Sequence, residues 1–209
     1  MTEPRMIQRL AAILAADVVG YAKLMEADER ATVTALDAGR TVFREYVAAH
    51  GGRIIDTAGD SVSAVFPSAT GAIEAAIEIQ DVLSARNETL AEDQRMHFRI
   101  GVNLGDVIEK DDGTVYGAGV NVAARLESLA TPGGVMISED VHRQVAGKGT
   151  RDFADAGVHA VKNIANPVRA FGLASGIDEP ASRPGPTLPD KPSIAVLPFD
   201  NRSSDPEQE

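Results

Sequence analysis

Three aspartates of this chain have the residue type and the placement of a site for divalent cations. Asp56 and Asp60 stand on either side of the short turn in RIIDTAGDSVSAVF, and Asp17 ends the apolar run LAAILAAD. Two carboxylates near one turn repel each other unless positive charge or hydrogen-bond donors lie beside them. Carboxylate oxygens are the ligands that hard cations such as Mg²⁺ prefer. The acids therefore predict a cation site if the fold brings two of them together. The alternative is that they only end a strand and cap a turn, as aspartate often does.

A second polar group lies in the later stretch NVAARLESLA, for which the apolar spacing predicts a helix. Asn121 and Arg125 are four residues apart, so their side chains project from one face of this helix. A guanidinium stabilises the negative charge of a phosphoryl group, and a carboxamide orients a polar ligand beside it. A solvated polar helix face is the alternative, and it explains the arginine better than the asparagine. Gly117 and Gly119 precede the helix, but the chain has neither a dinucleotide-binding glycine fingerprint nor a P-loop motif.

The apolar periodicity predicts the elements that must position these residues. In chain order we expect a strand at 9–18, a helix at 28–49, a hairpin of RIID and SVSAVF, a helix at 69–87, a strand at 96–109, a helix at 121–130, the strand VMIS, the short helix EDVHRQVA, and strands near 151–156 and 168–173. Gly101 and Gly105 are expected to bend or bulge the strand at 96–109. The order predicts an α+β fold with a ferredoxin-like βαββαβ core and a C-terminal extension. Its first and third strands pair antiparallel, which places Asp17 beside Asp60.

Composition excludes several classes of protein. The 209 residues include no cysteine, so neither a disulfide framework nor a thiolate metal site is available. A formal net charge of −11 argues against binding to a nucleic-acid backbone. The longest apolar run is too short to span a bilayer, and residues 1–9 lack the apolar stretch of a signal peptide. We therefore expect a cytoplasmic protein with no nucleic-acid and no membrane partner.

Three motifs together resemble the class III nucleotide cyclases, the adenylate and guanylate cyclase catalytic domain. They are LAADVVGY around Asp17, TAGDSV around Asp60, and TVYGAGVNVAARL at 114–126, and the resemblance runs from about residue 9 to residue 173. It implies an enzyme of intracellular signalling that converts ATP or GTP to the 3′,5′-cyclic monophosphate and pyrophosphate. A diguanylate cyclase would share the core, but the hairpin has no GGDEF- or GGEEF-like run.

The resemblance also implies a role for each residue that matches a family motif. Asp17, Asp60 and the backbone carbonyl of Val18 match the ligands of two Mg²⁺ or Mn²⁺ ions. Asn121 and Arg125 match the pair that orients the ribose and stabilises the transition state, and Lys162 in AVKNI matches a lysine that contacts the terminal phosphates. In this family the site is built across a homodimer. One subunit would bring the metal ligands, and the other would bring the base-reading residues, the asparagine and the arginine.

Two positions depart from the pattern of an adenylate cyclase. Where that pattern has a lysine four residues before the second metal aspartate, this chain has Asp56. Where it has an aspartate seven residues before the catalytic asparagine, this chain has Thr114. A carboxylate facing adenine N1 sets an acceptor against an acceptor, whereas it suits the N1–H and 2-amino donors of guanine. The family as a whole favours ATP as the substrate. The pair Asp56 and Thr114, however, resembles the residues with which guanylate cyclases of the family read GTP. Two alternatives stay open: relaxed specificity with Asp56 pointing elsewhere, or a weakly catalytic domain that senses nucleotide and regulates by conformation.

The resemblance and the composition together predict three segments. Residues 1–175 are expected to form the catalytic domain, and the proline-rich residues 176–192 a linker. Residues 193–209 contain SIAVLPFDN, which we interpret as the start of a further C-terminal domain that is cut short and disordered here.

Overall fold

The computed structural model describes residues 6–148, 151–160 and 167–173. Its strands are β1 (Met6–Val18), β2 (Arg53–Asp56), β3 (Val62–Phe66), β4 (Phe98–Lys110), β5 (Val115–Tyr116), β6 (Val135–Ser138), β7 (Ala154–His159) and β8 (Val168–Leu173). Its helices are α1 (Tyr21–Ala27), α2 (Glu29–Ala49), α3 (Ala69–Glu88), the 3-10 turn η1 (Glu92–Gln94), α4 (Ala118–Leu129) and α5 (Glu139–Val145). The predicted linker, the segment 193–209 and Lys162 lie outside the described residues.

The strands form one eight-stranded sheet in the order β2-β3-β1-β4-β6-β8-β7, with β5 paired to β4 beside this path. The first four strands in that order, with α2 and α3, are the ferredoxin-like core, and the remaining strands extend it. β1 pairs antiparallel with both β3 and β4, and β4 pairs parallel with β6. The predicted fold class and the predicted extension are confirmed.

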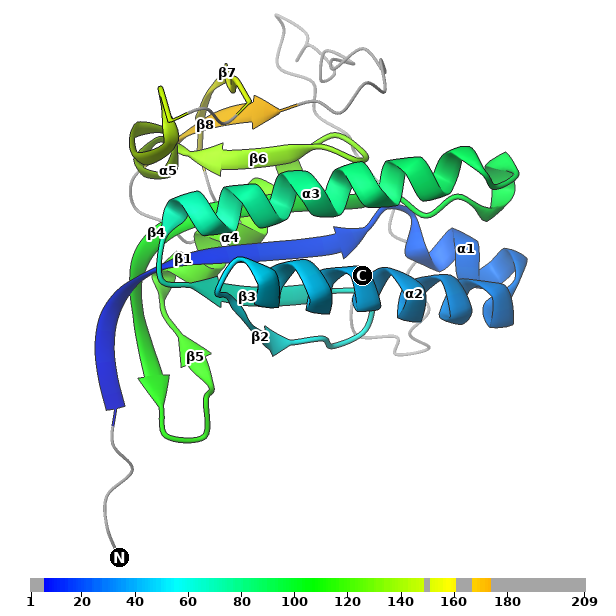
Figure 1. The fold of residues 1–209 in the computed structure, drawn as a ribbon, viewed down its shortest axis with the longest axis horizontal. Coiled ribbons are helices and arrows are strands. Elements are labelled where there is room, and N and C mark those ends of the chain that lie inside the picture. The colour runs from blue at the N-terminus through cyan, green and yellow to red at the C-terminus, as the bar shows by residue number, and fades with distance from the viewer. Residues whose placement is uncertain (1–5, 149–150, 161–166, 174–209) are drawn as a thin grey trace, which may run out of the picture. The chain divides into compact units, whose positions relative to one another are not determined.

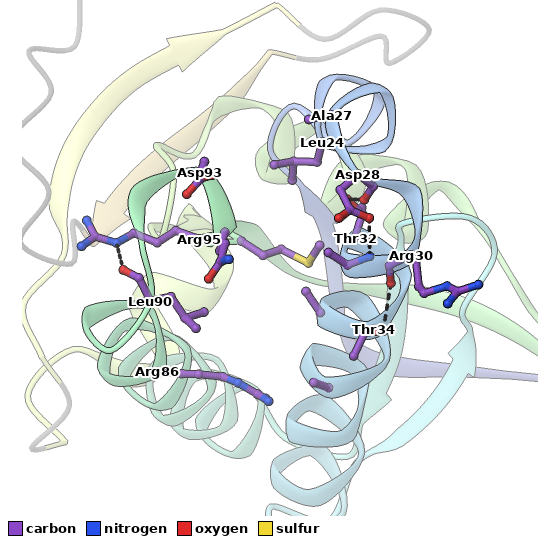
Figure 2. Close-up of a pocket in the computed structure, with 15 residues that line it drawn as sticks. Leu24, Ala27, Asp28, Arg30, Thr32, Thr34, Arg86, Leu90, Asp93 and Arg95 are labelled. Carbon is purple, nitrogen blue, oxygen red and sulfur yellow. Dashed lines mark hydrogen bonds between the residues drawn. The ribbon is translucent and has the colours of Figure 1, made fainter.

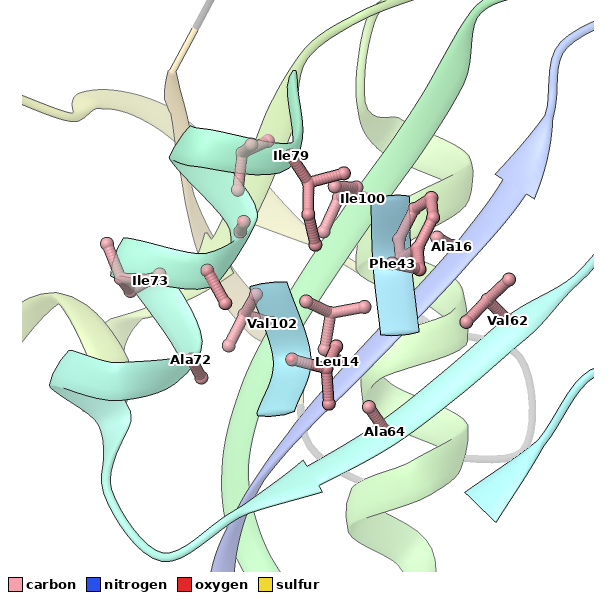
Figure 3. Close-up of a cluster of buried hydrophobic side chains, with 14 of the residues drawn as sticks. Leu14, Ala16, Phe43, Val62, Ala64, Ala72, Ile73, Ile79, Ile100 and Val102 are labelled. Carbon is pink, nitrogen blue, oxygen red and sulfur yellow. The ribbon is translucent and has the colours of Figure 1, made fainter. Parts of the chain in front are cut away.

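β1 is an inner strand of the sheet, between β3 and β4, and is buried on both faces along its second half. Leu14 and Ala16 face the layer formed by α2 and α3, where they meet Phe43 and Ile79 (Figure 3). The alternate residues of the strand face α4, which covers the other side of the sheet (Figure 1). A strand covered on both faces reads as a continuous apolar run, which is why LAAILAA shows no alternation.

Two of the predicted helices, α2 and α3, begin at side chains that accept a free N–H group of the first turn. Asp28 Oδ1 accepts the N–H of Ala31 over 2.9 Å at the start of α2, and Ser68 Oγ accepts that of Gly71 over 3.1 Å at the start of α3. The sequence reasoning did not predict α1, because this seven-residue helix has no buried residue and therefore no apolar periodicity.

Neither Gly101 nor Gly105 bulges β4, so the predicted bulge was wrong. The pairing of β4 with β1 runs without a shift from Met6 opposite Lys110 to Val18 opposite Phe98. Gly101 is required by helix packing instead, because a Cβ there would lie 2.2 Å from the carbonyl oxygen of Ala123 on α4. Close approach of α4 to the strand at this point brings the last turns of the helix beside the end of β1.

In the described part of the chain, no helix is both long enough and apolar enough to cross a bilayer.

Candidate active site

Asp17 is the penultimate residue of β1, and its carboxylate is held by Arg99, the residue opposite it on β4. Arg99 Nε donates to Asp17 Oδ1 over 3.1 Å, and Nη2 donates to Oδ2 over 2.8 Å. The two side chains are each 27% exposed. Two parallel N–H···O bonds are the strongest form of an arginine–carboxylate pair, and those bonds raise the pKa of Arg99. Asp17 is therefore oriented and charge-balanced within a single chain.

Glu127, on the inner face of α4, is a buried carboxyl group beside this pair. Its Oε1 lies 3.3 Å from Arg99 Nε but accepts no hydrogen bond, because that N–H is directed at Asp17. Burial, followed by a hydrogen bond with Asp17 and the charge of that aspartate, raises the pKa of Glu127 to about 8. At neutral pH the group therefore holds a proton, and it adds no negative charge to the neighbouring carboxylate.

Asp60 follows a turn that is fixed from α2. Gly59, which precedes it, has a φ of 59°, a left-handed conformation that glycine adopts without strain. Arg40 on α2 donates Nη2 to the carbonyl oxygen of Thr57 over 2.6 Å and also to that of Gly59. The turn that carries Asp60 is thus tied to a helix of the main core.

The topology brings Asp17 and Asp60 to one end of the sheet. Ala16 on β1 lies opposite Val62 on β3, so the residues that follow β1 and those that precede β3 share that edge. The charge of Asp60 acts on the pKa of Arg99, as does that of Asp17. Asp17 and Asp60 therefore lie at one end of the sheet, as the predicted ferredoxin-like pairing requires, although of these two only Asp17 forms an ion pair with Arg99 in the described structure.

The donor set at this edge fits a hard divalent cation. Asp17 and Asp60 supply carboxylate oxygens, and Val18, the last residue of β1, carries a backbone carbonyl next to them. Their charge is met here by a guanidinium, and oxygen ligands of this kind suit Mg²⁺ or Mn²⁺. Across the described residues, no three or more His, Asp or Glu side chains are arranged to hold a metal ion. A cation at this edge would therefore need oxygens from a ligand as well.

Asn121 and Arg125 lie on the outer face of α4. Both are exposed, and neither side chain has a hydrogen bond or ion pair within the described chain, whereas Ala123, Leu126 and Glu127 are buried. Arg125 and Glu127 are two positions apart, which is about 200° around a helix. The predicted pair does share one face, but this face points away from the carboxylates of its own chain.

The predicted base-reading residues lie at the ends of two hairpins. Asp56 ends β2 and is exposed, with no hydrogen bond or ion pair in the described structure. Thr114 precedes β5 and is half-buried, and its N–H is bound by Asp112 Oδ1 over 2.9 Å. The Asp56 side chain is available to a ligand, whereas the Thr114 hydroxyl also hydrogen-bonds to Asp112 and would have to exchange that partner for a ligand.

A pocket of about 740 Å³ lies elsewhere, between the start of α2 and the end of α3. Leu24, Asp28 and Thr32 line one side, and Arg86 and Arg95 line the other (Figure 2). None of the predicted site residues lines it. This pocket is therefore not the meeting place of the predicted site residues.

Arg99, Glu127 and Arg40 are site residues that the sequence reasoning missed. Arg99 had a usable signal, because the antiparallel pairing that joins β1 to β4 sets some residue of HFRIG directly opposite Asp17. The sequence signal for Glu127 was weaker: it is an acidic residue at a helix position where the periodicity predicts an apolar one. Nothing in the sequence near Arg40 points to the turn that it holds.

Comparison with known proteins decides the family. The family model described as the adenylate and guanylate cyclase catalytic domain matches residues 7–173. The chain belongs to this family of nucleotide cyclase domains. A Rhizobium meliloti (strain 1021) protein named as a candidate adenylate cyclase is 49% identical to it over 100% of this chain and 36% of its own length. The adenylate cyclase of Streptomyces coelicolor is 34% identical over 65% of this chain and 34% of its own length. The cyclase domain thus spans about a third of the length of these relatives.

Solved structures of cyclases share the fold of this domain. The adenylate/guanylate cyclase/hydrolase from Silicibacter pomeroyi is 37% identical, with a TM-score of 0.77 over 82% of this chain and 99% of that one. The guanylyl cyclase Cya2 is 22% identical, with a TM-score of 0.68 over 82% of this chain and 96% of that one. The second likeness concerns the fold alone.

Proposed function

We propose that this domain is a purine nucleotide cyclase of intracellular signalling, which converts ATP or GTP to the 3′,5′-cyclic monophosphate and pyrophosphate. The observation that supports the proposal is that Asp17 and Asp60 lie at the same end of the sheet, where Arg99 binds the carboxylate of Asp17. Because the chain belongs to the cyclase family, we interpret these two aspartates as the metal ligands of a nucleotide cyclase. The reaction joins the ribose 3′-oxygen to the α-phosphorus and releases pyrophosphate, so it needs positive charge beside the triphosphate.

Asp17, Asp60 and the carbonyl of Val18 would hold two Mg²⁺ or Mn²⁺ ions. Bound there, such ions would lower the pKa of the 3′-hydroxyl and neutralise charge on the triphosphate. The chain supports this role in two ways. Arg99 holds the carboxylate of Asp17 through two hydrogen bonds, and Glu127, whose pKa is raised to about 8, adds no like charge beside the metal ligands at neutral pH.

Asn121 and Arg125 would act on the sugar and on the reacting phosphoryl group. The carboxamide would hold the ribose in the orientation for in-line attack, and the guanidinium would stabilise the charge that develops on the α-phosphoryl oxygens. Both side chains are exposed and unpaired within the described chain, so they are free to contact a ligand. Lys162 would contact the terminal phosphates.

The site would be shared between two copies of the chain. The outer face of α4 points away from the carboxylates of its own chain, so the two groups meet only if a second chain supplies one of them. The free ends of β1, β4 and β5 extend past the helices (Figure 1) and offer an apolar surface for such contact. Met6, Leu10, Ile108 and Tyr116 are between 40% and 60% exposed there. The strand register puts all four on one side of the sheet. A two-fold dimer would then contain two identical sites.

The base would be read by Asp56 and Thr114. An unpaired carboxylate accepts from two adjacent donors, which guanine N1–H and its 2-amino group supply, and the threonine hydroxyl can donate to O6. The names of the relatives, adenylate cyclases, support ATP as the substrate of this chain, whereas the chemistry of Asp56 and Thr114 supports GTP. A polar edge that is mispaired in a closed site costs several kcal/mol, so one substrate is expected to dominate.

Product analysis tests the proposal. The 209-residue chain is incubated with ATP and with GTP separately, in Mn²⁺, and the cyclic products are quantified. The same assay is run on Asp56→Lys, which should shift preference towards ATP by roughly 10- to 100-fold. Cyclic AMP as the dominant wild-type product would overturn the role given to Asp56. No cyclic product from either nucleotide would overturn the cyclase and favour a nucleotide-sensing regulatory domain.

A further inference from the structure

Three residues separate Asp56 from Asp60 in the turn between β2 and β3. Arg40 on α2 donates Nη2 to the first and the third carbonyl oxygen of this turn, those of Thr57 and Gly59, the former over 2.6 Å. Hydrogen bonds from a charged donor are about twice as strong as those between neutral groups. A single guanidinium group therefore fixes both ends of the segment that joins the two aspartates.

The middle carbonyl of the turn is held as well. The carbonyl oxygen of Ala58 accepts the N–H of Ser61 over 3.1 Å and the hydroxyl of the same residue over 2.7 Å. Each of the three carbonyl groups between the aspartates thus has a donor inside the chain. The backbone conformation between the two aspartates is therefore set within a single chain.

Arg40 is largely buried where it meets the turn. Its side chain is only 17% exposed, and its Nε is buried without a hydrogen-bond partner in the described part of the chain. Nη1 lies 3.8 Å from Asp37 Oδ1, which is too long for a hydrogen bond. A buried charged group with an unpaired N–H costs stability. A role in stability alone therefore does not explain this arginine, whereas its two contacts with the turn point to a role in positioning.

We propose that Arg40 is a positioning residue for Asp56 and Asp60, and that it serves both sites of the proposed dimer at once. The inference rests on the proposed function, in which these two aspartates of one chain belong to different sites. Asp60 holds metal in one site, and Asp56 reads the base in the other. Among the proposed site residues, no other pair that belongs to different sites is so close in the sequence.

Loss of the Arg40 contacts should change the two sites in different ways. A released turn lets the carboxylate of Asp60 leave its place, so Mn²⁺ should bind roughly tenfold more weakly, the loss typical of groups that orient metal ligands. Asp56 would lose its fixed approach to the base, so the preference for one nucleotide over the other should fall by roughly tenfold. A residue that only supported the fold would lower activity with both nucleotides alike and leave their ratio unchanged.

The first test is Mn²⁺ binding by the full 209-residue chain without nucleotide, followed through the electron paramagnetic resonance signal of free Mn²⁺. Arg40→Gln should bind roughly tenfold more weakly than the wild type. Arg40→Lys should stay within about threefold of it, because one ammonium group can donate to both carbonyls as Nη2 does. The matched control is Arg44→Gln, the same substitution at an exposed position one turn along α2, which should bind Mn²⁺ as the wild type does.

The second test places Arg40→Gln in one chain of a mixed dimer. When Asp60→Asn and Arg125→Ala are mixed, the complete site takes its metal ligands from the Arg125→Ala chain and its base-reading residues from the Asp60→Asn chain. Arg40→Gln added to the Asp60→Asn chain should lower the nucleotide preference and leave the Mn²⁺ concentration for half-maximal activity unchanged. Added to the Arg125→Ala chain, it should raise that concentration and leave the preference unchanged.

Three results would overturn the inference. The first is Mn²⁺ binding by folded Arg40→Gln with the affinity of the wild type, the second is no Mn²⁺ binding by the wild type itself, and the third is the same change from either placement in the mixed dimer. Ser61→Ala covers the case in which Arg40→Gln does not fold. It removes one donor to the same turn, so both readouts should move in the same directions by roughly twofold. Wild-type values for both readouts in Ser61→Ala would then overturn the inference.

The inference and the proposed function fail differently. Weaker Mn²⁺ binding by folded Arg40→Gln, with no cyclic product from the wild-type chain, would keep the role of Arg40 at Asp60 and overturn the cyclase, and with it the role at Asp56. Cyclic product from the wild type, with Mn²⁺ affinity and nucleotide preference indifferent to Arg40, would do the reverse.

Discussion

The two halves of the proposed site differ in how completely one chain builds them. At the end of β1, Asp17 is fixed by two hydrogen bonds from Arg99, and the turn of Asp60 is tied to α2 through Arg40. On the outer face of α4, Asn121 and Arg125 are exposed, and neither side chain makes a hydrogen bond or ion pair within the described residues.

This difference separates the part of the site that folding of one chain supplies from the part that the proposed dimer would supply. Carboxylates that converge at one sheet edge must be neutralised for the single chain to be stable, so the fold provides Arg99 and keeps Glu127 protonated. An exposed asparagine and arginine do not destabilise a single chain, because water solvates them. They need no partner until a ligand and, in the proposed dimer, a second chain are bound. Changes in the first half should therefore alter the isolated chain, and changes in the second half should alter only catalysis.

The largest effect is expected from Asp60→Asn. Loss of one of two carboxylates should reduce kcat by roughly 10³-fold and should also weaken Mn²⁺ binding in the absence of nucleotide. Steady-state kinetics and the Mn²⁺ titration measure the two effects. Asp93→Asn, at an exposed position of η1, serves as the control and should change neither. If Asp60→Asn bound Mn²⁺ with the affinity of the wild type, Asp60 would not be a metal ligand.

Gly101→Ala should disturb the packing that joins the two halves. The new Cβ would lie 2.2 Å from backbone atoms of α4, which are unable to rotate away as a side chain would. We expect a loss of about 1–3 kcal/mol in the free energy of unfolding, measured by urea denaturation. Ala124→Ser, on the exposed side of the same helix, should cost less than about 0.5 kcal/mol. Equal stabilities would contradict the close approach of α4 to β4.

The smallest effect concerns the pH dependence of stability without metal. The pKa of Glu127 is raised from an ordinary 4.5 to about 8, so between these values the folded chain binds a proton that the unfolded chain releases. Stability contributed by this group is therefore complete below about pH 4.5 and declines as the pH rises towards 8. Urea midpoints of wild type and Glu127→Gln in EDTA, at pH 5.5 and pH 8.5, measure it. The wild type should lose more stability than the variant over this interval, and parallel changes would contradict the assigned pKa.

Much of the fold was predictable because its signals are local. The helices α2 and α3 have apolar stripes and capping residues, and RIID and SVSAVF flank a turn that contains Gly59. The seven residues of α1 and the two residues of β5 carry too little periodicity to be found. The bulge expected at Gly101 failed for a different reason. A glycine in a strand marks either a bend or a close neighbour, and only the position of α4 distinguishes the two.

The site was predictable to the extent that motifs carry it. The strand pairing that places Asp17 beside Asp60 follows from the order of elements, and the shared face of Asn121 and Arg125 follows from their spacing. The neutralising residues could not be found in that way. Arg99 and Glu127 act through contacts between β1, β4 and α4, which are distant in the chain, and their identity as partners depends on register and on helix approach.

The most direct test of the central claim, that two chains build each site of a nucleotide cyclase, is activity in a mixture of two inactive variants. Asp60→Asn lacks a metal ligand, and Arg125→Ala lacks the phosphoryl-stabilising guanidinium, while Arg44→Ala on α2 is the control for a lost exposed arginine. In an equimolar mixture about half of the dimers contain one chain of each variant, and each of these has one intact site of two. We predict about a quarter of the wild-type rate after mixing. A rate equal to the mean of the two separate variants would contradict the shared site.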